Sequence, residues 1–458
     1  MASSSRSSSS LPSSPSAHSL AALAPEIVEE IIAFLPPIPK SYLALSRVSH
    51  AFHSLCIRFI YGHIVLRSPS ALVQCFRAIV ATPNPLAVRS IEVNCRRELS
   101  SLASFSALVQ HCLVRLTNVT RLVIFAPEQT TSSFVSALQQ CSFPWLTHLE
   151  SCFSLDERMS AFLSRHPRIS YLQLDSLEPT SLGGEIRLPG LEYFVGNSTC
   201  LAPVARHASL RAAFITWDDA DEARDNQDVF AALERRSTDT LNVLACRRHS
   251  WNLDLLEQIS WHLPHIYALS LTNLFFVPVS RVSAETSPLD AIRRLLTRFS
   301  CLQRLAVSCV NVMDADDALP IEPNMDGAFE SVTSWGESCP SLLECTLPQS
   351  GTMKWIRICD NLWLPDLAHP TGPGSRWIWD RLRERRYPDW DRILETTHAR
   401  RGGAAAIAHM RLLALRDAAL DLRVPSHRMP QEEEQREIRL GGAGSMLEEE
   451  DVTETRTT

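Results

Sequence analysis

The sequence predicts an α/β protein in which a small domain of three helices precedes a longer series of short parallel strands with helices outside them. Two observations carry this prediction. Residues 23–66 contain three short amphipathic helical patterns, and from residue 88 onward a short apolar pattern recurs with helical segments between its copies. The length of 458 residues fits two or three structural units.

The first helix of the N-terminal domain is expected to begin at Pro25, because a helix tolerates proline in its first turn. Glu26 and its neighbours Glu29 and Glu30 place negative charge near the positive end of the helix dipole. Apolar residues recur along it in steps of three and four, at Ile27, Val28, Ile31, Phe34 and Leu35. Three prolines within residues 36–39 then end the helix.

Two more helical patterns follow the prolines. Ser41 is a candidate N-cap for a second helix that carries Leu43, Leu45 and Val48. The third pattern runs through Phe52, Leu55, Cys56 and Phe59. A unit this small buries little apolar surface alone, so we expect it to complete its core against a partner or the next domain. An ordinary helical subdomain without a special partner is the alternative.

These residues resemble the F-box, whose motif opens with Leu-Pro-x-Glu-Ile/Leu and continues into a Leu-x-x-x-x-x-Val-Ser helix and a third helix with an aromatic residue near its start. The matching residues are Leu23, Glu26, Ile27, Ile31, Leu35, Leu43, Val48, Ser49 and Phe52. The chain departs from the motif at Ala24, where the family has proline, and its turn lacks the Asp often found there.

The resemblance implies binding to a Skp-type adaptor and, through it, to a cullin. The implied adaptor contacts are Leu23, Pro25, Glu26, Ile27, Ile31, Leu35, Leu43 and Val48. Such an apolar helix face is suited to docking into a partner groove.

The repeated pattern is apolar-x-x-apolar, often followed by x-apolar. Its copies begin at Val88, Val119, Leu146, Ile169, Leu191, Leu210, Leu241, Ile266, Leu302 and Leu342. Helices are expected over Ser132–Gln140, Glu157–Arg165, Asp228–Arg236, Leu253–His262 and Leu289–Phe299. A strand and a returning helix cannot bury their apolar faces singly, so stacked units are expected to form a solenoid with a concave binding face.

The repeats resemble leucine-rich repeats in a degenerate form, because their lengths are irregular and the usual Asn or Cys is absent or shifted. An F-box followed by such repeats is a familiar pairing among fungal proteins. A non-repeating α/β domain with similar buried strands remains the alternative. Side chains between the apolar positions point away from the core, and the candidate target-binding residues are Arg121, His148, Glu150, Tyr171, Gln173, Asp175, Tyr193 and Arg304.

Composition excludes several classes of protein. The formal charge of −7 comes almost wholly from residues 431–458, with nine acidic and three basic side chains, and the chain has only two lysines, Lys40 and Lys354. We therefore expect no nucleic-acid binding, and no apolar run is long enough to predict a membrane span. Thirteen scattered cysteines and a Ser-rich start without an apolar core predict free thiols and a cytoplasmic or nuclear protein. An organelle transit peptide is the alternative for that start.

No catalytic constellation is recognisable, so we expect neither enzymatic activity nor a cofactor or metal. The sequence has no phosphate-binding glycine loop and no Gly-x-Ser-x-Gly elbow. The histidine pairs His50/His53 and His262/His265 have no third ligand at a recognisable spacing, and the acidic residues 218–222 are expected to form a solvated loop.

The C-terminal region is rich in Trp and Arg and is expected to cap the last repeat, with an Ala/Leu/Arg-rich helix over 404–423. The expected domains are a disordered stretch 1–19, the helical domain 20–66, the repeats 67–365, the cap and helix 366–425, and a disordered acidic tail 426–458.

Together these features predict a substrate-recognition subunit of an SCF-type cullin ubiquitin ligase, which holds an unknown protein target for ubiquitin-dependent degradation. Three alternatives stay open. They are an F-box scaffold without a ligase role, a repeat protein whose helical start is only an N-terminal cap, and an enzyme with an unrecognised site.

Overall fold

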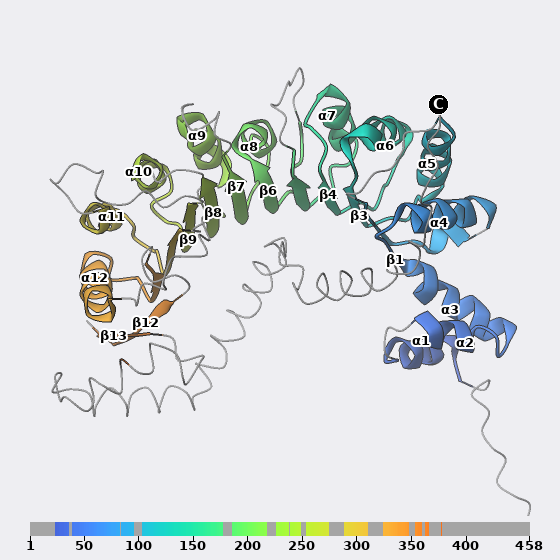
Figure 1. Ribbon diagram of the computed structural model, residues 1–458, viewed down its shortest axis with the longest axis horizontal. Helices are drawn as coiled ribbons and strands as arrows, with labels where there is room; N and C mark the ends of the chain where they lie inside the picture. Colours follow the sequence, from blue (N-terminus) through green and yellow to red (C-terminus); the bar gives the residue numbers. More distant parts are fainter. Residues whose placement is uncertain are drawn as a thin grey trace, which may run out of the picture. The chain divides into compact units, whose positions relative to one another are not determined.

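The computed structural model describes residues 23–35, 39–82, 84–95, 103–176, 186–217, 226–237, 239–248, 253–273, 288–309, 324–347, 353–359, 362–365 and 377. These residues form a mixed α/β structure with three N-terminal helices followed by a sheet of mainly parallel strands and its helices (Figure 1). The expected disordered ends, the acidic cluster 218–222 and the helix 404–423 lie outside the described residues.

The N-terminal helices are α1 (Pro25–Ala33), α2 (Pro39–Leu45) and α3 (His50–Gly62). Helix α1 begins at Pro25 as expected, without a side-chain cap. Helix α2 begins at Pro39 instead of after Ser41, since the fixed φ of proline suits a first helical turn. The Ser49 side chain caps α3 by accepting a hydrogen bond from the Phe52 N–H at 3.2 Å.

The core of this helical domain is small. It consists of Val28, Ile32, Tyr42 and Cys56, with six partly buried apolar side chains packed around them. The Tyr42 ring stacks on Phe59 with centroids 5.3 Å apart. Glu29 of α1 pairs with Arg58 of α3 at 3.2 Å, and both side chains remain exposed to solvent. Such an exposed ion pair adds little stability, so apolar packing holds the three helices together.

The described part of the chain forms one sheet of thirteen strands whose spatial order follows the sequence from β1 to β13. The strands are β1 (His63–Leu66), β2 (Ser90–Asn94), β3 (Arg121–Phe125), β4 (His148–Ser151), β5 (Tyr171–Leu174), β6 (Tyr193–Asn197), β7 (Ala212–Thr216), β8 (Val243–Arg248), β9 (Ala268–Asn273), β10 (Arg304–Cys309), β11 (Glu344–Thr346), β12 (Lys354–Cys359) and β13 (Leu362–Pro365). Strands β1 to β11 are parallel, and β12 and β13 are antiparallel to their neighbours.

Helices connect the parallel strands and lie along one face of the sheet (Figure 1). They are α4 (Pro69–Ala81), followed by the 3₁₀ helix η2 (Asn84–Ala87), α5 (Ala103–Arg115), α6 (Glu128–Gln140), α7 (Glu157–Ser164), α8 (Ser198–Ala205), α9 (Asn226–Ser237), α10 (Leu253–His262), α11 (Pro288–Leu296) and α12 (Met325–Ser338). Parallel strands need such crossovers because each strand must return to the same edge before the next begins.

The sheet begins earlier than the sequence pattern predicts. We expected the helical domain to extend to residue 66, but residues 63–66 form β1 and pair in parallel with β2. Helix α3 ends at Gly62, so it leads into β1 without an intervening loop. The repeated pattern begins with an apolar residue in the turn before each strand. Before β1 that turn is replaced by the end of α3, so the pattern did not reveal this strand.

A continuous apolar row runs across the sheet and explains why the sequence pattern recurs. The pairing register aligns Ile91, Leu122, Leu149, Leu172, Phe194, Ala213, Leu244, Leu269, Leu305 and Cys345, and all of them are buried. The first residue of each pattern, from Val88 to Leu342, lies in the turn before its strand and is also buried. The ten patterns therefore mark β2 to β11.

The same backbone hydrogen-bond arrangement recurs in the turns before successive strands, although the number of residues between the strands varies. The Arg89 carbonyl accepts hydrogen bonds from the N–H groups of both Thr120 and Arg121, at 2.8 and 3.1 Å. The Thr120 carbonyl does the same for residues 147 and 148, and corresponding pairs recur as far as Gln303 with residues 343 and 344. Insertions are accommodated outside this turn, so the strands remain in register.

The last two strands close the sheet with aromatic packing. Trp355 of β12 and Trp363 of β13 are fully buried, and the Trp355 ring lies 5.6 Å from that of Trp377. The Trp377 indole donates a hydrogen bond to Asp326 of α12 at 3.1 Å. Trp355 and Trp363 lie within residues 67–365, where repeats were expected, but their strands form an antiparallel hairpin that ends the parallel series.

Every cysteine whose surroundings the structure describes is a free thiol. Burial raises the pKa of the Cys141 thiol to about 12, so this side chain acts as a small apolar group. No described helix is long and apolar enough to cross a membrane.

The closing hairpin gives a test of this packing. A Cβ at Gly336 of α12 would lie 2.8 Å from the Trp363 indole nitrogen, whereas a Cβ at Gly62 would meet nothing within 4 Å. Gly336→Ala is expected to lower the free energy of unfolding by about 1–3 kcal/mol because the buried indole must move. Gly62→Ala is the matched control and should leave it unchanged or raise it. Urea denaturation of the full chain measures both, and equal effects would contradict this account.

Candidate functional site

Exposed apolar side chains are concentrated on the N-terminal helices. Within the described residues, six of the eleven large apolar side chains that are exposed belong to residues 23–48, namely Leu23, Ile27, Ile31, Phe34, Leu43 and Val48. We call these six residues the apolar helix surface. Phe34 is 87% exposed and Val48 is 67% exposed, values unusual for side chains of this kind.

Helix α1 carries apolar residues on two faces. Val28 and Ile32 are buried in the core of the domain, whereas Ile27 and Ile31 are each 46% exposed. The sequence pattern predicts one widened stripe along this helix, but the packing divides it. Val28 and Ile32 hold the three helices together, whereas Ile27 and Ile31 face outward.

The structure places the expected adaptor-binding residues in two groups. Those exposed to solvent are Leu23, Pro25, Glu26, Ile27, Ile31, Leu43 and Val48. Leu35 differs, because it is partly buried against the core formed by Val28, Ile32, Tyr42 and Cys56. Phe34 was not among the expected contacts, although its place in the apolar pattern of α1 gave a signal for it.

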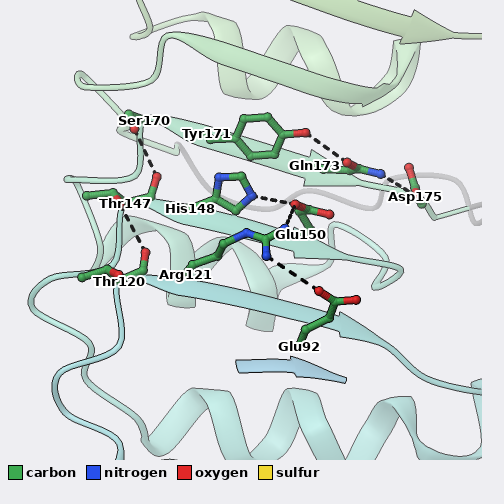
Figure 2. A network of polar contacts seen from close by, with 10 residues as sticks. All are labelled: Glu92, Thr120, Arg121, Thr147, His148, Glu150, Ser170, Tyr171, Gln173 and Asp175. Atoms are coloured by element: carbon green, nitrogen blue, oxygen red, sulfur yellow. Dashed lines mark hydrogen bonds and ion pairs between the residues drawn. The ribbon is translucent and has the colours of Figure 1, made fainter. Parts of the chain in front are cut away.

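A second surface is the face of the sheet opposite the helices, which we call the open face (Figure 1). On strands β2 to β5 it carries a connected polar network (Figure 2). Arg121 lies between two carboxylates, 2.9 Å from Glu150 and 3.7 Å from Glu92. The His148 ring nitrogen lies 2.6 Å from Glu150.

The network continues onto β5. The Tyr171 ring stacks on His148 with centroids 4.0 Å apart and planes inclined by 7°. The Tyr171 hydroxyl donates to Gln173 at 3.1 Å, and the Gln173 amide donates to Asp175 at 2.8 Å (Figure 2). Six of the residues expected to bind a target are therefore joined to one another, since Arg121 connects to this chain through Glu150 and His148.

Glu150 is the electrostatic centre of the network. Burial by itself would raise the pKa of its carboxyl group, but hydrogen bonding and charge from His148 and Arg121 outweigh it and hold this pKa below the ordinary value of 4.5. The carboxylate is therefore ionised near neutral pH. Beside the network, the hydroxyl groups of Thr120, Thr147 and Ser170 donate to backbone carbonyls in the turn before the preceding strand and secure these turns. Figure 2 shows the bonds from Thr147 to Thr120 and from Ser170 to Thr147.

Tyr193 and Arg304 lie on the open face outside this network. Tyr193 begins β6, beside Tyr171 in the pairing register, and is half-buried. Arg304 lies four strands further on, where its Nε contacts Glu344 at 2.7 Å. Sequence reasoning missed Glu92 and Glu344. Both occupy positions that alternate with the buried apolar residues of their strands, and this placement could have identified them.

The histidines noted in the sequence do not form a shared site in the described residues. His50 and His53 have ring centroids 6.5 Å apart, and His262 pairs with Glu234 at 2.7 Å. Within the part of the chain that the structure describes, no group of three or more His, Cys, Asp or Glu residues is placed to hold a metal ion. The two features that stand out in the described residues are therefore surfaces: the apolar helix surface and the polar network of the open face.

Comparison with known proteins identifies one domain. Residues 20–62 match the F-box domain. An F-box implies a role in the assembly of SCF-type ubiquitin ligases, in which F-box domains generally bind Skp-type adaptors. The search of curated proteins found no significant match.

Among solved structures, the chain is similar to a Bacteroides fragilis protein whose crystal structure came from the Northeast Structural Genomics Consortium. The two share 12% sequence identity, and the alignment covers 63% of this chain and 74% of that one with a TM-score of 0.35. A score this low does not establish a shared fold.

The network predicts how stability depends on pH. Because the pKa of Glu150 is lowered in the folded state, its contribution is present above about pH 4.5 and is lost as the pH falls through the folded-state pKa. Glu150→Gln is expected to lower the free energy of unfolding by about 2 kcal/mol near neutral pH. The difference from the wild type should shrink below about pH 4.5.

Chemical denaturation between pH 3 and pH 8 measures this difference. Glu330→Gln, on the exposed surface of α12, is the control and should change little at any pH in that range. A deficit in Glu150→Gln that stays constant down to pH 3 would show that the ionised carboxylate is not what stabilises the network.

Proposed function

We propose that this protein is a substrate-recognition subunit of an SCF-type cullin ubiquitin ligase. Its F-box binds a Skp-type adaptor, and its sheet domain, a degenerate leucine-rich-repeat solenoid, holds a protein target for ubiquitin-dependent degradation. The protein makes no covalent bond itself. It acts in the cytoplasm or the nucleus by raising the concentration of the target near a bound transfer enzyme.

The observation that supports this proposal most directly is the F-box match over residues 20–62 together with the exposed apolar helix surface. Ile27 and Ile31 lie on the same side of α1, one helical turn apart, and face away from the core of the domain. Exposure of such apolar side chains to water is unfavourable, and their burial in a partner's groove lowers the free energy. We assign the adaptor interface to this surface.

The repetition of one backbone arrangement supports the solenoid part of the proposal. Successive strands pair in register and in sequence order, with their helices on one face. In such an array each unit packs chiefly against its neighbours, and the face without helices offers an extended surface to a partner. We place target binding on this open face.

The decisive experiment is affinity purification of the full chain with and without Ile27→Asp plus Ile31→Asp. Both side chains are 46% exposed, so the variant is expected to fold, whereas a charge at the partly buried Leu35 would disturb the core. Loss of two central apolar contacts should weaken capture of a Skp-type adaptor by about 100-fold or more. The cullin should be lost with it, and partners of the sheet domain should remain.

Val114→Asp provides the control, because Val114 on α5 is 45% exposed and lies outside the F-box. Adaptor capture should be unchanged in this variant. Retention of the adaptor by the double variant would refute the assignment. Recovery of the adaptor without any cullin from the wild type would favour an F-box scaffold without a ligase role.

A further inference from the structure

The open face has two zones of different chemistry on neighbouring strands. The first, which we call the charged zone, is the network of Figure 2 on β2 to β5. The second, the apolar zone, lies on β6 to β8 and comprises Tyr193, Ala212, Phe214 and Val243, all of them half-buried. Both zones consist of residues that alternate along their strands with the buried apolar row, and they therefore lie on the face opposite helices α4 to α12 (Figure 1).

The charged zone has an excess of negative charge among the described residues. Glu92, Glu150 and Asp175 contribute three carboxylates, and Arg121 contributes one guanidinium. Arg121 is held more closely by Glu150, at 2.9 Å, than by Glu92, at 3.7 Å. The Glu92 side chain is 24% exposed, so this carboxylate is open to a further cation.

The apolar zone is built around Phe214. In the pairing register its ring stands between Val195 on β6 and Ala245 on β8, while Ala212 shares its strand. The Phe214 side chain is half-buried, and its neighbour on β8, Ala245, is short. Arg247 bounds the zone at the far end of β8, so the positive charge lies away from the carboxylates of β2 to β5.

We propose that the open face binds a target segment which directs a Lys or Arg side chain to the charged zone and an apolar side chain to Phe214. This proposal rests on the proposed function, because it specifies the kind of target that the sheet domain holds. The positive charge proposed for the target segment follows from the carboxylates of the charged zone, since Glu92 and Glu150 would repel an acidic segment. A basic residue would instead gain a favourable contact.

The spacing of the strands sets the spacing of the recognised residues. Glu92 on β2 and Phe214 on β7 occupy the same row of the register, five strands apart. At about 4.8 Å between neighbouring strands the two positions are separated by about 24 Å. An extended segment that crosses the strands covers this distance in about seven residues, at roughly 3.3 Å for each residue.

A display library of random 12-residue peptides, selected on the purified full chain, tests the proposal. Recovered sequences should share a Lys or Arg about seven residues from a large apolar residue. Acidic sequences, or the absence of any shared motif, would overturn it. The selection does not involve the adaptor, so its outcome is independent of the Ile27→Asp plus Ile31→Asp experiment.

The best recovered peptide is then measured by fluorescence anisotropy against defined variants. Glu92→Gln plus Asp175→Asn removes two charges at the rim of the network and should weaken binding about fivefold, with a smaller dependence on salt. Phe214→Ser should weaken it about tenfold. Glu330→Gln plus Glu337→Gln, both exposed on α12, removes the same charge from the other side of the sheet and should leave binding unchanged.

Thermal unfolding of each variant is recorded alongside the binding measurement. Equal weakening by the α12 control and the Glu92 plus Asp175 variant would show that only net charge matters and would overturn the proposed site. If Phe214→Ser fails to fold, the Glu92 plus Asp175 variant still decides the outcome, since both substituted side chains lie at the surface.

Discussion

Burial of one apolar row across the sheet is the constraint on which the rest of the structure depends. Residues from Ile91 to Leu305 lie side by side in register and exclude water together with the helices above them. A strand with one such apolar face is unstable alone, so each unit needs its neighbours. Helices α4 to α12 cover that face, so side chains that alternate with the row, such as Arg121, His148 and Glu150, lie on the opposite face of the sheet (Figure 1).

The two surfaces proposed to bind partners differ in chemistry because they arise from different elements. Helix α1 buries Val28 and Ile32 in a small core and leaves Ile27 and Ile31 outside, which suits a stable apolar contact with a constant partner. The open face is polar and charged on β2 to β5, where Arg121, Glu150 and His148 hold one another in place (Figure 2). Such a surface favours discrimination among partners over affinity.

Several features could be read from the amino-acid order because local rules govern them. Pro25 starts α1 where its fixed φ suits the first turn, and Ser49 caps α3. The recurrence of apolar residues marked ten of the strands. Successive side chains of a strand point to opposite faces, so a strand with one buried face has an apolar residue at every second position. Other features were missed. Strand β1 has no leading apolar turn, and the start of α2 at Pro39 competes with a plausible cap at Ser41.

The sequence by itself determined strands β2 to β11, helices α6, α7, α9, α10 and α11 between them, the F-box match at residues 20–62 and the choice of residues that alternate with the core. Only the tertiary structure decided that Ile31 faces outward while Ile32 is buried, since both are equally apolar and packing against α2 and α3 selects between them. It also decided that Arg121 and Glu150 meet, while Arg304 joins Glu344 six or more strands away from them. Contacts of this kind depend on the register between strands, which pairs residues far apart in the chain and leaves no trace in local spacing.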